Sequence, residues 1–198
     1  TKTGGLRSGW TLKIWSDDST EYYDAAGLLL KVVQRNGWTT TITYSTASTP
    51  PTIATIAGLP ITITNHFGRK LQLRYNDIGQ LIKLIDPAGG EIKYGYDTSL
   101  NLTQVIWQDN TVKKYVYGTP ANGRLTGVID ELGVRIGTYA YDSQGRVTST
   151  EKTNGAEKLT LLYNADKSTS ITDYTPSPTG IGAPTATTRT HRFGTAQG

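Results

Sequence analysis

Seven of the twelve tyrosines recur along the chain at a nearly constant spacing. Successive members of this series lie 21, 31, 21, 21, 24 and 22 residues apart, and they are Tyr23, Tyr44, Tyr75, Tyr96, Tyr117, Tyr141 and Tyr163. A regular period of about twenty to fifty residues is typical of repeat architectures, in which one small structural unit is copied and stacked. The spacing therefore predicts a repetitive fold, and it directs the search for function toward what a repeated unit can build.

The composition favours strands over helices. The chain of 198 residues contains 33 threonines and 12 tyrosines, and isoleucine is also frequent. Such β-branched and aromatic side chains suit a pleated, half-buried surface, and 22 glycines and 8 prolines supply frequent turns. We therefore predict an all-β fold. Cysteine is absent, which excludes disulfides and cysteine-based metal sites.

A short motif that follows several of these tyrosines predicts a chain reversal. It reads Tyr, Asp or Asn, two variable residues, Gly, any residue, then Leu or Val. Asp and Asn side chains hydrogen-bond to the nearby backbone and open turns, whereas Gly adopts a positive φ without strain. We expect a strand that ends at Tyr, a turn, and a returning strand that begins at Leu or Val. The predicted structural positions are Tyr23, Asp24, Gly27, Tyr75, Gly79, Leu81, Tyr96, Asp97, Leu102, Tyr117, Tyr141, Asp142, Gly145 and Tyr163.

Apolar residues alternate with polar ones before each of these turns. Leu73 and Tyr75 are two residues apart, as are Tyr94 and Tyr96. Residues two apart share a face of a strand, so we expect an apolar face, with residues such as Lys93 on the other. A second reversal halfway through each period is predicted at residues 36–37, 86–89, 109–110, 130–133 and 154–155. The sequence thus predicts a meander of antiparallel β-hairpin repeats that forms a curved strip.

The motif, its period and the second reversal together resemble the Rhs/YD-repeat family, whose consensus is Tyr-Asp-x-x-Gly-x-Leu. The resemblance covers most of the chain, roughly from Trp15 to Tyr174. Some repeats depart from the consensus: Leu100 occupies the Gly position, and the motif after Tyr163 lacks Gly. Residues 117–125 carry a two-residue insertion. Tyr44 is followed by no turn motif, and we place a looped insertion, rich in Ser, Thr and Pro, at about residues 45–60.

The resemblance also implies an organisation and a function. We expect an N-terminal strand region (residues 1–21), a YD-repeat β-strip (22–175) and a linker or degenerate repeat (176–198). Bacterial Rhs proteins, the B and C components of Tc toxins and animal teneurins wind a long β-strip into a hollow shell, and in the bacterial cases the shell encloses a C-terminal toxin domain. The implied function is a structural shell segment of a secreted protein that encapsulates a toxin and helps to deliver it.

The same resemblance implies the partners and the location. The partners would be the remainder of the parent chain, the enclosed toxin domain and secretion-apparatus proteins, and delivery would use a bacterial system such as type VI secretion. The chain has no methionine and begins at Thr1, so we expect it to be a fragment of a longer protein. No stretch has the roughly 18 apolar residues of a membrane span. The basic residues are scattered, which does not favour nucleic-acid binding.

Residue types that carry catalysis, or that bind metals and cofactors, form no recognisable motif. His66 and His191 are the only histidines, and each is interpreted as a surface residue rather than a general base. The acidic pairs at 17–18 and 130–131 lie in predicted turns. Residues 86–89, Asp-Pro-Ala-Gly, fit a mid-repeat turn better than the self-cleavage segment of Rhs proteins. We therefore expect a protein that is not an enzyme and uses no metal or cofactor.

Two alternative functions stay open at this stage. An enzyme would bring His66 and His191 together with carboxylates in a cleft. A carbohydrate- or cell-surface-binding β-repeat module would instead turn its aromatic rings outward for stacking, using the tyrosines and Trp10, Trp15, Trp38 and Trp107. The exposure of the rings distinguishes such a module from a shell.

Overall fold

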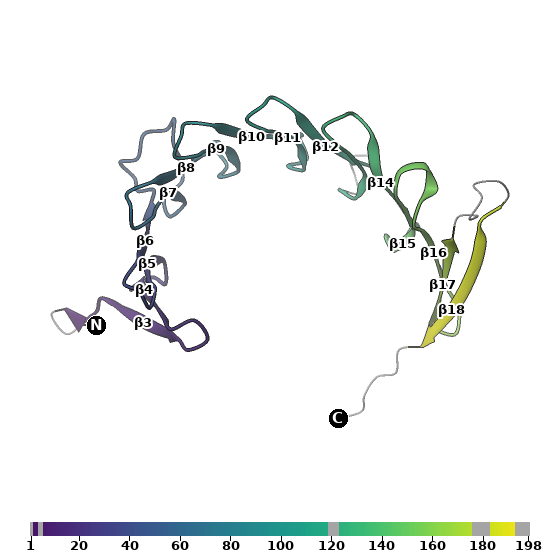
Figure 1. Ribbon diagram of the computed structural model, residues 1–198, viewed down its shortest axis with the longest axis horizontal. Coiled ribbons are helices and arrows are strands. Elements are labelled where there is room, and N and C mark those ends of the chain that lie inside the picture. The colour runs from purple at the N-terminus through teal and green to yellow at the C-terminus, as the bar shows by residue number, and fades with distance from the viewer. Residues whose placement is uncertain (1, 4–5, 119–122, 176–182, 193–198) are drawn as a thin grey trace. The chain divides into compact units, whose positions relative to one another are not determined.

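The computed structural model describes residues 2–3, 6–118, 123–175 and 183–192. Within these residues the chain is almost entirely β-strand, and its one helical element is a 3₁₀ turn, η1, at Thr153–Gly155. A small hairpin of β1 (Lys2–Thr3) and β2 (Leu6–Arg7) precedes a sheet of sixteen described strands, in which β3 to β18 follow one another in chain order. The predicted all-β meander of antiparallel strands is confirmed (Figure 1).

The chain divides into two compact units, Thr1–Tyr94 and Gly95–Gly198, with the boundary inside β10 (Glu91–Tyr96). The first unit contains β3 (Gly9–Ile14), β4 (Ser19–Asp24), β5 (Leu29–Val33), β6 (Thr39–Tyr44), β7 (Pro60–Thr64), β8 (Lys70–Tyr75) and β9 (Leu81–Ile85). The second contains β11 (Leu102–Ile106), β12 (Val112–Tyr117), β13 (Leu125–Ile129), β14 (Arg135–Tyr141), β15 (Val147–Glu151), β16 (Lys158–Tyr163), β17 (Ser168–Thr175) and β18 (Thr185–Arg192). The segment interpreted as a linker or a degenerate repeat thus includes a strand, β18, which pairs along its whole length with β17.

Each unit has one face rich in apolar side chains, called here the apolar face, and an opposite polar face. In the first unit, Leu73 of β8 pairs with Leu84 of β9, and the adjacent Arg74 pairs with Lys83. Because successive residues point to opposite faces, the leucines lie on the apolar face and the cations on the polar face. Lys83 forms an ion pair with Glu91 at 2.8 Å. In the second unit the apolar face carries Tyr115, Tyr117, Tyr139, Tyr141, Leu159, Leu161 and Tyr163.

The strands of each unit form a single layer. No helix or second sheet covers either face within the described residues, as Figure 1 shows. Few side chains are therefore fully buried, and the buried apolar residues among those described are Ala54, Tyr75 and Val105. A sheet of this kind draws its stability from contacts between neighbouring hairpins, as repeat proteins do.

The insertion after Tyr44 folds back onto the next repeat. It connects β6 to β7, and the Tyr75 N–H donates to the carbonyl of Ile53 at 2.9 Å. Thr55 Oγ1 donates to the carbonyl of Asp77 at 3.1 Å, in the turn that follows Tyr75. The insertion thus covers one turn of the strip, and it contributes the buried Ala54.

Candidate structural site: the tyrosine and turn repeat

The hairpins are closed by turns with a common pair of backbone hydrogen bonds. At residues 142–146, the Asp142 N–H donates to the Arg146 carbonyl at 2.9 Å, and the Gly145 N–H donates to the Asp142 carbonyl at 3.0 Å. Asp142 Oδ1 also accepts the N–H groups of Gln144 and Arg146, each at 2.9 Å. One carboxylate oxygen therefore satisfies two backbone donors and fixes the turn. The same backbone pair recurs at 24–28, 34–38, 65–69, 76–80, 86–90, 97–101, 107–111, 130–134, 152–156 and 164–168.

The fourth residue of these turns adopts a positive φ, which Gly tolerates best. Its value is 94° at Gly27, 82° at Gly79 and 83° at Gly145. Where the consensus Gly is missing, the backbone keeps the same conformation, with φ of 68° at Leu100 and 64° at Lys167. Those two turns therefore form against the steric cost of this conformation, about 1–2 kcal/mol for a residue with a Cβ.

Strand pairing shifts by one residue at the motif tyrosines. Tyr22 pairs with Lys31, but Tyr23 pairs with Leu29, so that Leu30 is an extra residue on β5. Such a β-bulge interrupts the ladder of backbone hydrogen bonds and leaves part of the longer strand unpaired. The same shift occurs at Tyr44, Tyr75, Tyr117 and Tyr141.

The hydroxyl of a motif tyrosine binds at the bulge of the preceding repeat, a contact called here the tyrosine–bulge hydrogen bond. Tyr44 Oη donates at 3.0 Å to the carbonyl of Leu29, the residue that pairs with Tyr23. Each such bond ties one hairpin to the one before it through a backbone acceptor. Further bonds of this kind run from Tyr75 to Pro60 at 2.7 Å, from Tyr141 to Leu125 at 2.8 Å and from Tyr163 to Val147 at 2.9 Å.

Tyr23, the first tyrosine of the series, has different surroundings. Its hydroxyl donates to Glu21 Oε2 at 2.5 Å, and this hydrogen bond raises the pKa of the tyrosine. Its ring stacks on Trp10, with 6.0 Å between the ring centroids. The Trp10 ring also lies close to Gly27, where a Cβ would meet it at 3.6 Å. A tryptophan therefore packs here against both the tyrosine and its turn.

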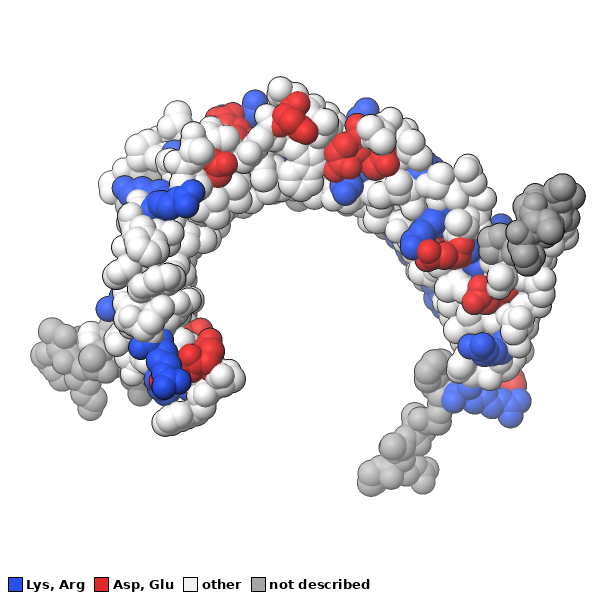
Figure 2. All heavy atoms as spheres, in the orientation of Figure 1, with Lys and Arg blue, Asp and Glu red and all other residues white. Residues whose placement is uncertain are grey.

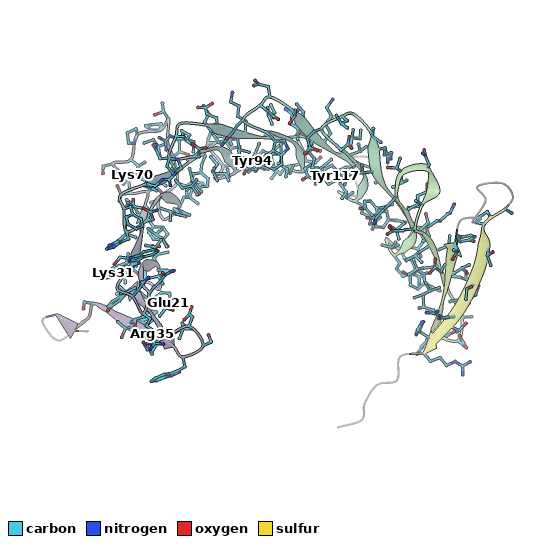
Figure 3. All side chains as sticks on the ribbon, viewed as in Figure 1. Glu21, Lys31, Arg35, Lys70, Tyr94 and Tyr117 are labelled. Carbon is cyan, nitrogen blue, oxygen red and sulfur yellow. The ribbon has the colours of Figure 1, made fainter. Side chains whose placement is uncertain are left out.

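Other motif positions lie at strand ends. Tyr96 ends β10, and Leu81 and Leu102 begin β9 and β11. Tyr117, labelled in Figure 3, ends β12 and is half-buried. Burial raises the pKa of Tyr117, and the nearby Asp97 carboxylate adds to this effect.

Side chains next to the turns form hydrogen bonds and a cation–π contact with the turn carboxylates and a motif tyrosine. Arg146 Nε donates to Asp142 Oδ2 at 2.7 Å, and the guanidinium lies over the ring of Tyr163 at 4.1 Å. The backbone hydrogen bond from Arg146 is the main cause that lowers the pKa of Asp142. The Asn101 side chain does the same for Asp97, since its Nδ2 donates to Oδ2 at 3.1 Å. These carboxylates therefore accept hydrogen bonds most effectively in their charged form.

Two features of the repeat were not predicted from the sequence. The turn at residues 65–69 was not predicted, although Asn65 and Gly68 occupy the positions that Asp and Gly occupy elsewhere. The tyrosine–bulge hydrogen bond was not predicted either. Its donor and acceptor lie 15 or 16 residues apart, and only the strand register brings them together.

The two histidines considered for catalysis belong to different units, and each has its own local partners. His66 contacts Trp38 and Phe67 in the first unit, and His191 of β18 pairs with Thr169 of β17 in the second. In the part of the chain that the structure describes, no group of three or more His, Asp or Glu residues could hold a metal ion. Within the same residues, no helical segment has the length and apolar character that a membrane span requires. Figure 2 shows acidic and basic side chains interspersed on the visible face of each unit.

Comparison with known families decides what this repeat is. The family model named teneurin YD-shell matches residues 10–181. The chain belongs to the teneurin YD-shell family. Membership confirms the YD-repeat interpretation of the tyrosine series, and it gives the chain a structural shell role. No curated protein matches the chain by sequence.

One solved structure supports the fold of this YD-shell chain. The crystal structure of TcdB2-TccC3 without its hypervariable C-terminal region is similar with a TM-score of 0.54 and 17% identity, over 93% of this chain and 10% of that one. TcdB2-TccC3 itself has a TM-score of 0.40 and 14% identity, over 86% of this chain and 12% of that one. TcdB2-TccC3-TEV also has a TM-score of 0.40 and 14% identity, over 79% of this chain and 12% of that one. The YD-shell chain thus spans about a tenth of the length of the solved chains it matches.

Proposed function

We propose that this YD-shell chain is part of the wall of a hollow β-shell, which encloses the C-terminal toxin domain of a secreted parent protein and helps to deliver it. In this proposal the strip of residues 22–175 is the wall, and the motif tyrosines and turn residues maintain its shape. The remainder of the parent chain is the main partner. A bacterial secretion apparatus is the proposed route of delivery.

The observation that carries the proposal is an apolar sheet face that no second layer covers within the described residues. Leu73, Leu84 and Tyr94 lie on that face of the first unit, and none of them is fully buried. A sheet with one apolar face is stable when another layer covers it. An enclosed domain, or the lining of a closed shell, provides such a layer.

The two ends of the sheet support the same interpretation. Among the described strands, β3 and β18 are the outermost in the strand order, and each pairs there with one neighbour. An outermost strand of a sheet can be extended by pairing with a further strand. Continuation of the strip in the parent protein on either side would add such strands.

The test uses the full parent protein and two adjacent positions on opposite faces. A photo-activated benzoyl-phenylalanine replaces Tyr94 on the apolar face (labelled in Figure 3) or Lys93 on the polar face. We expect irradiation to cross-link position 94 to the C-terminal domain or to other lumen-lining segments. Position 93 should give no cross-link to that domain. Mass spectrometry of the cross-linked peptides identifies the partners.

The control is protection of the same C-terminal domain from protease. In the intact parent the domain should resist digestion, and partial urea denaturation should expose it. Equal cross-linking from both faces would contradict the proposed orientation of the wall. A C-terminal domain that is digested as quickly in the intact parent as when expressed alone would contradict encapsulation itself.

A further inference from the structure

Three aromatic rings of the first unit contact one another at the edge that carries the mid-repeat turns. The Trp38 ring stacks on His66 with 6.2 Å between centroids and meets Phe67 edge-on at 5.2 Å. The turn at 34–38 supplies the tryptophan, and the turn at 65–69 supplies the other two. Despite these contacts, Trp38 remains 47% exposed and Phe67 66% exposed. The cluster thus presents aromatic surface to solvent, as binding sites often do.

A groove of about 600 Å³ begins at Phe67, the member of this cluster that lines it. Phe67 forms part of one wall, in the turn at 65–69, and Pro87 forms part of the other, in the turn at 86–90. Gln72 and Ile85, which pair across β8 and β9, lie between the two turns. The volume is within the range of sites for small ligands, about 300–1,000 Å³.

The charge of the groove is positive. Arg69 and Lys70 line it, both are exposed, and no ion pair within the described residues includes either of them. The one carboxylate of the lining, Asp86, already accepts the N–H groups of Ala88 and Gly90 through Oδ1, at 2.7 and 2.8 Å. Two cations beside an aromatic ring favour an anionic ligand that also has an apolar face.

The backbone around the groove does not suit an extended peptide. Strands β7, β8 and β9 each pair on both sides, so they offer no free edge for strand addition. The turn N–H groups of Phe67 and Arg69 donate to Asn65 Oδ1, each at 3.0 Å. Recognition therefore depends on side chains, namely aromatic faces and the two cations. A pyranose ring stacks its C–H face on an aromatic ring, and a carboxylate on that sugar can pair with Arg69 or Lys70.

We propose that this groove, with the Trp38–His66–Phe67 cluster at its end, is a binding site for acidic saccharides that contain uronate units. The proposal goes beyond the wall function. Lys70 (labelled in Figure 3) and Gln72 lie on the polar face, opposite Leu71 and Leu73. The site therefore stays accessible when another layer covers the apolar face.

The test measures binding of three probes to the full chain by calorimetry and by tryptophan fluorescence. The probes are hexagalacturonate, the uncharged maltohexaose, and a hexaglutamate peptide. We expect hexagalacturonate to bind with a Kd of about 10⁻⁴ M, and both other probes to bind at least about tenfold more weakly. The fluorescence change should disappear in Trp38→Phe. It should persist when Trp107, in the second unit, is replaced instead.

The variants separate charge from stacking. Arg69→Gln with Lys70→Gln should weaken hexagalacturonate binding by about a hundredfold, and Phe67→Ser by about tenfold. Lys152→Gln is the matched control, since Lys152 is an exposed cation of another mid-repeat turn; it should bind as the unchanged chain does. All of these residues are exposed, and thermal unfolding should verify that each variant folds.

Several outcomes would overturn the proposal. Absence of saturable hexagalacturonate binding at 5 mM, about fifty times the expected Kd, would exclude the site. Equal loss in Lys152→Gln would show attraction to net charge rather than to the groove. Hexaglutamate binding as tight as hexagalacturonate would assign the groove to acidic peptides, and maltohexaose binding as tight would remove the role of the two cations.

Discussion

Tyr75 and Tyr141 occupy equivalent positions in two repeats, yet their surroundings differ. Each ends a strand, precedes a turn of the same type and forms a tyrosine–bulge hydrogen bond. Tyr75 is 8% exposed, because the insertion of residues 45–59 folds over its turn and accepts its backbone N–H. Among the described residues, no comparable insertion folds over the turn after Tyr141, and that tyrosine is only half-buried. A single-layered sheet cannot bury its own apolar face. The burial of Tyr75 therefore comes from a local addition to its repeat, whereas the hydrogen bonds that the two repeats have in common come from the motif itself.

The largest expected effect tests this contrast directly. Tyr75→Ala should lower the free energy of unfolding by about 3–5 kcal/mol, because it leaves a cavity beneath the insertion. Tyr141→Ala should cost less, about 1–3 kcal/mol, since its ring already contacts solvent and its hydroxyl makes one hydrogen bond. Urea unfolding of both variants provides the comparison. Equal losses would show that the insertion adds nothing to the burial energy of the repeat.

The next effect concerns what holds the insertion in place. Ser45 is 4% exposed; its Oγ donates to the Ile56 carbonyl at 2.7 Å and accepts the Leu59 N–H at 2.9 Å. Ser45→Ala should cost about 1–3 kcal/mol, because it leaves both partners without this hydroxyl. Ser143→Ala, in the uncovered turn after Tyr141, is the control and should change stability by less than about 0.5 kcal/mol. A Ser45 variant as stable as the control would mean that the insertion is held by its apolar contacts alone.

A smaller effect is expected from loss of a tyrosine–bulge hydrogen bond, which is present both in the repeat with the insertion and in repeats without it. Tyr163→Phe removes the donor to the Val147 carbonyl and should cost about 0.5–1.5 kcal/mol. Tyr139→Phe is the matched control, because within the described residues no hydrogen bond of the Tyr139 hydroxyl is present. Chemical denaturation of the two variants should show a loss for the first alone. Identical losses would mean that water replaces the tyrosine at the bulge.

The turn carboxylates should add a pH dependence, in small steps because they are exposed to solvent. The pKa values of Asp97 and Asp142 are lowered in the folded chain, chiefly by the Asn101 side chain and the Arg146 backbone. A folded pKa below the unfolded value, about 3.9, gives a stabilisation that is present above that pH and is lost as the pH falls.

Asp97→Asn with Asp142→Asn keeps an acceptor oxygen in each turn but removes the titration, and Asn76 already occupies the equivalent position in another repeat. The double variant should therefore lose less stability between pH 6 and about pH 3 than the unchanged chain does. Unfolding in urea at the two pH values measures this difference. The same acid sensitivity in both chains would place the titrating groups elsewhere.

The local features of this fold could be predicted from the sequence, and the contacts between repeats could not. The motif at Asp142 and Gly145 specified its turn because the side chain acts on its own backbone, and alternation specified the apolar face of strands such as the one that ends at Tyr75. The acceptor of each tyrosine hydroxyl depends on a one-residue bulge in a neighbouring hairpin, which leaves no local signal. For the same reason, the contact between Trp38 and Phe67 followed only from the arrangement of two hairpins.

The smallest expected effect concerns a turn that forms without its glycine. Leu100 has a φ of 68° and is 59% exposed, so it accepts backbone strain without gaining much burial. Leu100→Gly should relieve about 1–2 kcal/mol of that strain, but Gly loses about 0.5–1 kcal/mol more on folding because its unfolded state is freer. The net change should be a small stabilisation, between zero and about 1.5 kcal/mol. Gly145 is at the equivalent position of the repeat that begins at Tyr141. Gly145→Leu should lower the stability of the chain, because a Cβ there would meet the guanidinium of Arg124. If Leu100→Gly instead lowered the melting temperature clearly, the leucine would make a packing contact that matters more than its backbone conformation.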